Sequence, residues 1–147
     1  MKTWTGSNQS MQQSVMGTSF VAYRGRGFWS WDGYLEHLLA LLASEIGPSP
    51  DEAWLAGARD HWLEQSSGIY SAMIDPELDE FASSDQRSAV LLSLLDAVCR
   101  RDDVTHELID TAGLLSKLLH GDLTTTESSP LDYMVSGPQP YQRCAPK

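Results

Sequence analysis

The stretch Tyr34-Leu-Glu-His-Leu-Leu-Ala-Leu-Leu-Ala-Ser-Glu-Ile-Gly-Pro48 carries the strongest fold signal in this 147-residue chain. Its large apolar residues recur at spacings of three and four, which places them on one face of a helix. These residues are Leu35, Leu38, Leu39, Leu42 and Ile46. Gly47 and Pro48 then supply a typical helix end, because glycine suits the C-terminal cap and proline cannot continue the helix. The stretch therefore predicts one amphipathic helix.

Three further helices are predicted downstream. Ser49-Pro50-Asp51-Glu52 has the form of a capping box and predicts the start of the second helix. Its expected apolar face comprises Leu55, Ala58, Trp62, Ile69 and Met73, with Gly68 ending or bending the helix. Asp75-Pro76 marks a turn, and a short helical turn is expected over 76–81. Ser83 with Gln86 predicts the start of the third helix, and Asp102 or Asp103 caps a fourth that ends at Gly121.

These elements predict an all-α fold, a small four- to five-helix bundle with an extended N-terminal segment and an irregular C-terminal tail. We expect a flexible segment at residues 1–19, a helical domain at 20–122 and a Pro/Ser/Thr-rich tail at 123–147. Residues 19–23 are the only weak strand candidate. Met1, Met11 and Met16 are all compatible with the start of translation.

The charge of the chain is strongly acidic and unevenly distributed. The formal net charge is −10, whereas residues 30–122 alone carry 18 acidic and 5 basic side chains, or −13. Binding of nucleic acid needs a basic face for the phosphates, so we exclude nucleic acid as a partner. A basic protein surface is the complementary partner that such a charge favours.

The densest acidic patch comprises Asp75, Glu77, Asp79 and Glu80. One interpretation is structural, because carboxylates stabilise the first turn of a helix. The second is functional, with the patch meeting a basic surface of another protein. The third is calcium binding, although the alternating ligands and the loop glycine of an EF-hand are missing.

The segment Arg24-Gly25-Arg26-Gly27 precedes an aromatic cluster that contains Trp29 and Trp31. Its glycines and arginines are compatible with an anion site, but we expect the arginines to pair with the acidic body. Tryptophan is enriched at binding hot spots. We therefore predict that Trp29, Trp31 and the four carboxylates of the acidic patch contact a partner.

No motif predicts catalysis, a cofactor or a metal site, and we expect no enzyme activity. His106-Glu107-Leu108-Ile109-Asp110 lacks the second histidine of a zinc-protease helix. The adjacent pairs Glu36-His37 and Asp60-His61 point in different directions on a helix, so neither forms a dyad. Cys99 lies beside a leucine-rich face and is expected to be buried, without an activating neighbour.

The sequence has no secretory signal and no apolar run long enough to span a membrane. We therefore expect a cytoplasmic protein that does not act on membranes.

Residues 23–29 (Tyr-Arg-Gly-Arg-Gly-Phe-Trp), followed by an acidic helix pair containing residues 58–62 (Ala-Arg-Asp-His-Trp), resemble small bacterial immunity proteins. Such proteins accompany secreted polymorphic, contact-dependent or type VI toxins. The resemblance covers about residues 23–101 and implies that the protein binds a cognate toxin domain stoichiometrically and blocks its basic active-site cleft. The alternatives are a helical adaptor or oligomeric interaction module and a metal-dependent helical-bundle enzyme.

Overall fold

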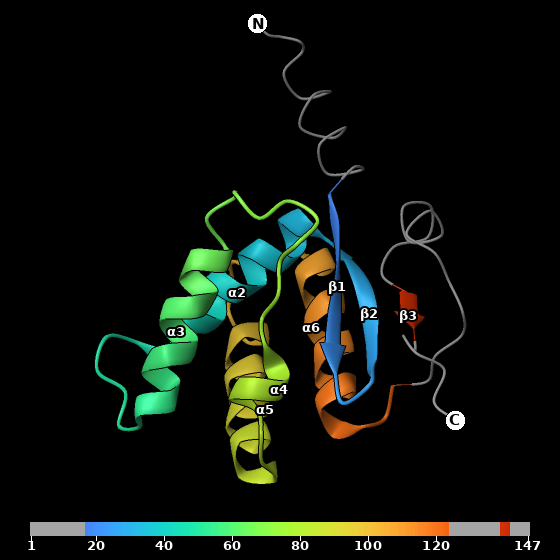
Figure 1. The fold of residues 1–147 in the computed structure, drawn as a ribbon. Coiled ribbons are helices and arrows are strands. Elements are labelled where there is room, and N and C mark those ends of the chain that lie inside the picture. Colours follow the sequence, from blue (N-terminus) through green and yellow to red (C-terminus); the bar gives the residue numbers. More distant parts are fainter. Residues whose placement is uncertain (1–16, 124–138, 142–147) are drawn as a thin grey trace, which may run out of the picture.

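The computed structural model describes residues 17–123 and the backbone of residues 139–141. In these residues, five helices follow a β-hairpin, and a third short strand joins the hairpin (Figure 1). The strands are β1 (Thr18–Tyr23), β2 (Arg26–Trp31) and β3 (Gln139–Tyr141). The helices are α2 (Asp32–Ile46), α3 (Ala53–Gln65), α4 (Leu78–Phe81), α5 (Asp85–Cys99) and α6 (His106–His120).

Helix α2 is the centre of the molecule, because it contacts α3, α5, α6 and β2. The leucine face predicted for this helix is confirmed: Leu35, Leu38 and Leu39 are fully buried, and Leu42 is 2% exposed. The predicted end is confirmed as well, since Gly47 caps α2 with a positive φ of 81°. The hydrophobic spacing therefore identifies the buried face of α2 correctly.

The all-α prediction is wrong, because residues 18–31 form an antiparallel hairpin. Arg24 and Gly25 are its two turn residues, and both have positive φ, 52° and 83°, as a tight primed turn requires. The Arg-Gly-Arg-Gly segment is thus a hairpin turn. Val21 pairs with Phe28 across the ladder, and both are fully buried against the helices.

The alternation that would have predicted these strands is obscured by aromatic residues on both faces. The outward positions include Phe20 and Trp29, which pair across the hairpin and meet edge to face with ring centroids 5.1 Å apart. Gly27 on β2 allows close packing, because a Cβ there would overlap the carbonyl oxygen of Val21 and the ring of Phe20. A strand with one exposed face shows alternating apolar and polar residues. These two strands carry apolar residues on both faces, so the alternation is missing.

The three strands lie in the order β1-β2-β3, so β1 is an edge strand. In Figure 1 the chain between α3 and α4 descends beside this edge before it enters α4. Tyr23 at the end of β1 donates a hydrogen bond of 2.7 Å to the carbonyl oxygen of Ala82, just after α4. The edge of the sheet is therefore joined to the helical part of the molecule.

Three predicted helix starts are wrong by one to three residues. Helix α3 begins at Ala53 with no side-chain cap, so the Ser49 capping box does not form. Ser84 caps α5 in place of Ser83, and Thr105 caps α6 in place of Asp102 or Asp103. Ser84 and Thr105 are of the residue types that favour capping, and the tertiary packing decides which of the candidate residues is used.

The predicted division into segments is only partly covered by the described residues. Residues 1–16, with the three candidate start methionines, and residues 124–138 and 142–147 lie outside them. Thr18 and Ser19, assigned to the flexible segment, begin β1. No helix of the described part is long and apolar enough to cross a bilayer.

Candidate functional site

The connection between α3 and α4, residues 66–77, is the most distinctive surface feature of the described chain. The sequence places Ile69 and Met73 on the apolar face of the second predicted helix, with Gly68 ending or bending that helix. The placement of Ile69 and Met73 on a buried helix face is wrong. Helix α3 ends at Gln65, and Ile69 and Met73 are 75% and 70% exposed. The 66–77 connection thus presents the two most exposed large hydrophobic side chains of the described residues.

Two buried side chains from other elements hold the middle of the 66–77 connection. Asp32, the first residue of α2, accepts a hydrogen bond of 2.7 Å from the backbone amide of Ala72. Ser19 on β1 donates to the other oxygen of the Asp32 carboxylate at 2.6 Å and accepts from the amide of Ile74 at 3.1 Å. Because Asp32 and Ser19 are buried, the two bonds of Ser19 are shielded from water, and the bond from Ala72 to Asp32 is partly shielded.

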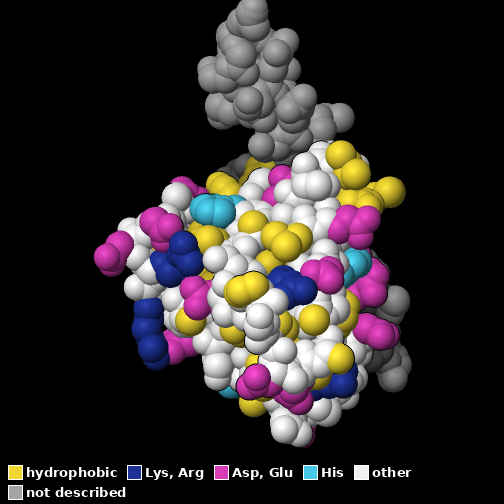
Figure 2. Space-filling model, turned by 90° about the vertical axis from the view of Figure 1, so that its left-hand side faces the viewer, with side chains coloured by type: hydrophobic (Ala, Val, Ile, Leu, Met, Phe, Trp, Pro, Cys, Tyr) yellow, Lys and Arg dark blue, Asp and Glu magenta, His cyan; other side chains and the backbone are white. Residues whose placement is uncertain are grey.

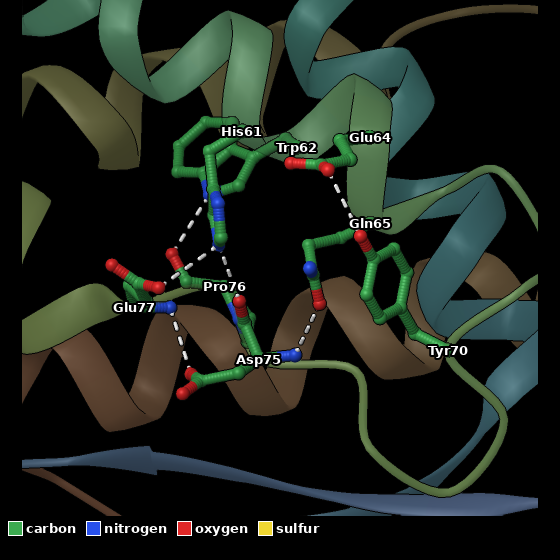
Figure 3. Close-up of polar contacts among 8 residues, drawn as sticks. All are labelled: His61, Trp62, Glu64, Gln65, Tyr70, Asp75, Pro76 and Glu77. Atoms are coloured by element: carbon green, nitrogen blue, oxygen red, sulfur yellow. Dashed lines mark hydrogen bonds and ion pairs between the residues drawn. The ribbon is translucent and has the colours of Figure 1, made fainter.

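Helix α3 holds the end of the 66–77 connection (Figure 3). The indole of the fully buried Trp62 donates to the carbonyl oxygen of Pro76 at 2.9 Å. The side-chain oxygen of Gln65 accepts from the amide of Asp75 at 2.8 Å. His61 Nε2 lies 2.7 Å from the carbonyl oxygen of Asp75, so the nitrogen carries the proton and donates.

Two residues of the connection have a left-handed backbone conformation, which is unfavourable for residues with a Cβ atom, and hydrogen bonds hold both of them in place. Ala72 and Glu77 have φ of 64° and 52°, in the left-handed region, which costs a residue with a Cβ about 1–2 kcal/mol. The amide of Ala72 donates to Asp32, and the amide of Glu77 donates to the Asp75 carboxylate at 2.9 Å. Strain of this kind persists where the surroundings determine the conformation, and such sites are often functional.

The acidic patch predicted from sequence lies at the end of this connection and on α4. Asp75 and Glu77 are exposed, and Glu77 Oε2 lies 3.5 Å from His61 Nε2 (Figure 3). Asp79 accepts a hydrogen bond of 2.9 Å from the amide of Arg24 at the hairpin turn. Glu80 is exposed on α4. Asp79 thus has a structural contact as well as exposure to solvent.

Trp29 and Trp31, the other predicted contact residues, are both half-buried on β2. Trp29 packs against Phe20 and lines a hollow together with residues of the 66–77 connection. Trp31 immediately precedes α2 and does not line this hollow. The structure therefore brings Trp29 and Asp75 together, and it places Trp31 elsewhere.

The hollow has a volume of about 270 Å³ and lies between the hairpin and the 66–77 connection. It is lined by Phe20, Ala22, Trp29, Ala72, Met73, Ile74 and Asp75. Asp75 is the only charged residue in this lining. Aromatic rings, a thioether and one carboxylate thus meet at a single concave place on the surface.

A hydrogen bond raises the pKa of Tyr70, another residue of the connection. Tyr70 donates a hydrogen bond of 2.9 Å to Glu64 on α3 (Figure 3). This bond raises the pKa of Tyr70, because the deprotonated phenol could not donate it. The phenol therefore keeps its proton and ties the start of the connection to α3.

The surface on the α3 side of the molecule mixes side chains of several kinds (Figure 2). Hydrophobic side chains reach the surface in its centre and project at its upper edge, and acidic side chains are scattered around them. Leu63 on α3 is 49% exposed, in addition to the two exposed residues of the 66–77 connection. An apolar centre with a charged surround is the usual composition of a protein–protein interface.

The remaining sequence candidates do not form a site in the described residues. His106 lies 3.6 Å from Asp110 on the exposed face of α6. Within the described ranges, no group of three or more His, Cys, Asp and Glu side chains is arranged to hold a metal ion. Cys99 was expected to be buried, but it is only half-buried. The pKa of its thiol is raised mainly by this partial burial and, to a lesser extent, by the negative charge of Asp96.

The sequence does not single out the three polar side chains that organise this surface, Asp32, Ser19 and Gln65. Their partners lie 10 to 55 residues away in the chain, so no local pattern indicates them. Asp32 is recognisable in the sequence as an acidic residue in the first turn of a helix. That pattern indicates the start of a helix, and it does not indicate a hydrogen bond to a distant loop.

Comparisons with known proteins give no relative: no family model, no curated protein and no solved structure matches this chain. The candidate site therefore rests on its own geometry.

Proposed function

We propose that this protein acts by binding another protein through the 66–77 connection and the acidic patch, as a stoichiometric inhibitor of the immunity type. The observation that carries the proposal is an ordered, strained connection that exposes Ile69 and Met73. In the proposed complex, a secreted bacterial toxin domain is blocked at its active site within the cytoplasm.

The order of the connection supports binding, because an interface that is already rigid loses less conformational entropy when a partner docks. At least four hydrogen bonds from three elements hold residues 72–76 in place. They involve Asp32, Ser19, Gln65 and Trp62. A connection needed only to join two helices would not require exposed apolar side chains on so constrained a backbone.

The charge supports a basic partner. The carboxylates of Asp75, Glu77 and Glu80 lie on exposed residues beside the apolar surface, within a body of net charge −13. Such charges steer association and select the partner more than they add affinity. A toxin that acts on nucleic acids or nucleotides has a basic cleft, which fits this surface and the resemblance to immunity proteins.

The test begins with the product of the neighbouring open reading frame. We expect it to be toxic when expressed alone, harmless when co-expressed with this protein, and bound in a 1:1 complex by calorimetry. The variant Ile69→Ser/Met73→Ser should weaken binding about 30-fold or more, as hot-spot residues do. Ile109→Ser, which changes a 40% exposed residue of α6, is the matched control and should leave binding unchanged.

The contribution of charge is measured separately. Asp75→Asn/Glu77→Gln/Asp79→Asn/Glu80→Gln should slow association about tenfold and reduce its dependence on salt. If both the Ile69/Met73 variant and the carboxylate variant bound the partner with unchanged affinity and association rate, this surface would not be the interface. Self-association of the isolated protein in place of the 1:1 complex would favour the adaptor function.

A further inference from the structure

The hollow between the hairpin and the 66–77 connection has a defined chemical character. Two aromatic side chains from neighbouring strands, Phe20 and Trp29, contribute to it, and Met73 and Asp75 contribute from the connection. The T-shaped contact between the two rings leaves them inclined at 67° to each other. Its volume of about 270 Å³ is comparable to one large side chain and is too small for a folded element.

The lining favours a positive charge. Aromatic faces attract cations through their quadrupole, and a thioether sulfur is polarisable. Asp75, the only charged residue there, adds a full negative charge. No basic residue lines the hollow, so its own lining does not neutralise this carboxylate.

The position of Asp75 is fixed before any ligand arrives. Its amide donates to Gln65, its carbonyl oxygen accepts from His61, and its Oδ1 accepts from the amide of Glu77. Among the described residues none donates to Oδ2 of Asp75. The carboxylate therefore keeps an acceptor available on an ordered backbone.

Trp29 supplies a reporter group for the hollow. Its indole Nε1 is buried and has no hydrogen-bond acceptor within the part of the chain that the structure describes. An unpaired buried donor is costly, so its surroundings are finely balanced, and Trp29 lines the hollow. The indole N–H signal therefore reports on changes in the hollow.

We propose that this hollow is a recognition site for a cationic side chain, arginine or lysine, carried by the protein partner. The cation contacts the aromatic rings and Asp75, and it selects basic partners over neutral ones. This inference deepens the proposed function, because it names the chemistry that the interface recognises.

The experiment measures the hollow alone, with no partner present. Nα-acetyl-arginine-N-methylamide and the corresponding lysine derivative are titrated into the ¹⁵N-labelled full chain, and the indole N–H signal of Trp29 is followed by NMR. Trp29→Phe assigns that signal among the five tryptophans. A saturable shift in the millimolar range with either derivative is expected.

Charge is separated from shape by the citrulline derivative, which has nearly the size of arginine but no charge. It should bind about fivefold more weakly, since it loses the cation–π attraction and the ion pair. Asp75→Asn keeps an oxygen for the amide of Glu77 and should weaken arginine binding about threefold. Asp51→Asn is the matched control and should not change it, because Asp51 lies two residues before the start of α3, whereas the 66–77 connection follows the end of that helix.

Equal binding of the citrulline and arginine derivatives, or no shift with either cation, would overturn the inference. The outcome is independent of the neighbouring gene product. A cation-selective hollow with no toxin partner would refute the immunity function alone, and a toxin complex with an unselective hollow would refute this inference alone.

Discussion

The carboxylate of Asp32 accepts a hydrogen bond of 2.7 Å from the backbone amide of Ala72, which lies forty residues further along the chain. The same carboxylate accepts from the hydroxyl of Ser19 at 2.6 Å. One buried acid at the start of α2 therefore joins the hairpin to the 66–77 connection. This junction positions the surface that we propose for partner binding.

Asp32→Ala should release the connection without removing the core. Because the amide of Ala72 and the hydroxyl of Ser19 lose a charged acceptor, the free energy of unfolding should fall by about 2–3 kcal/mol. Hydrogen exchange should accelerate at residues 69–77 more than in α5. Asp32→Asn retains an acceptor oxygen and should show a smaller effect. Equal exchange rates in wild type and Asp32→Ala would refute the role of this junction.

Gly27→Ala should be strongly destabilising. The new methyl group would overlap the carbonyl oxygen of Val21, which is backbone and cannot rotate away, and the ring of Phe20. We expect a loss of at least about 2 kcal/mol in chemical denaturation. Gly113→Ala on α6 is the control, because nothing lies within 4 Å of its added Cβ. That substitution should stabilise the protein by about 0.5–1 kcal/mol through helix propensity.

The carboxyl group of Asp103 should titrate below its ordinary range. Hydrogen bonding from Arg101, at 3.0 and 3.1 Å, holds the pKa of Asp103 down. Since the folded state lowers this pKa, the pair stabilises the fold above the unfolded pKa, and the contribution is lost as the pH falls through the folded pKa. NMR titration should show the Asp103 pKa rising in Arg101→Met.

Arg100→Met provides the matched control for that titration. Arg100 is adjacent to Arg101 in sequence but pairs with Asp96 on α5, the helix that Arg100 caps. The Asp103 titration should therefore not change in this variant. A shift of similar size in both variants would mean that general loss of positive charge, and not the Arg101 hydrogen bonds, sets the pKa.

The Cys99 thiol should react slowly at neutral pH. Burial, and then the negative charge of Asp96, raise the pKa of Cys99, so less thiolate is present than in a free thiol. In a Cys144→Ser background, the alkylation rate should reach half its maximum at a higher pH than for N-acetylcysteine. Unfolding in urea should abolish the difference. A half-maximal pH equal to that of the free thiol in the folded protein would contradict this prediction.

The helical core could be predicted because its signals are local. The buried leucine positions of α2 recur within eight residues, and Gly47 and Gly121 end helices with the positive φ that glycine tolerates. The caps were less predictable, since Ser83 and Ser84 are equally suitable residues and only packing distinguishes them. The weak strand candidate at residues 19–23 lies in β1, but its partner β2 and hence the hairpin were missed, because apolar side chains occupy both faces of the hairpin.

The candidate site was predicted in part. The sequence singled out Asp75, Glu77, Asp79, Glu80, Trp29 and Trp31 by charge density and residue type. It did not indicate that Trp29 and Asp75 line one hollow, or that Ile69 and Met73 are exposed on a connection in place of a helix face. A spacing that fits a helix does not itself show that the helix continues.

The sequence by itself determined the helix-forming segments, the acidic body and the apolar face of α2, because each depends on residues that are neighbours along the chain. Only the tertiary structure decided the sheet, the path of residues 66–77 and the hollow beside Trp29. These depend on contacts such as Ser19 with Ile74 and Asp32 with Ala72, between residues 55 and 40 positions apart. The free energy of such contacts exists only once the chain has brought both residues together.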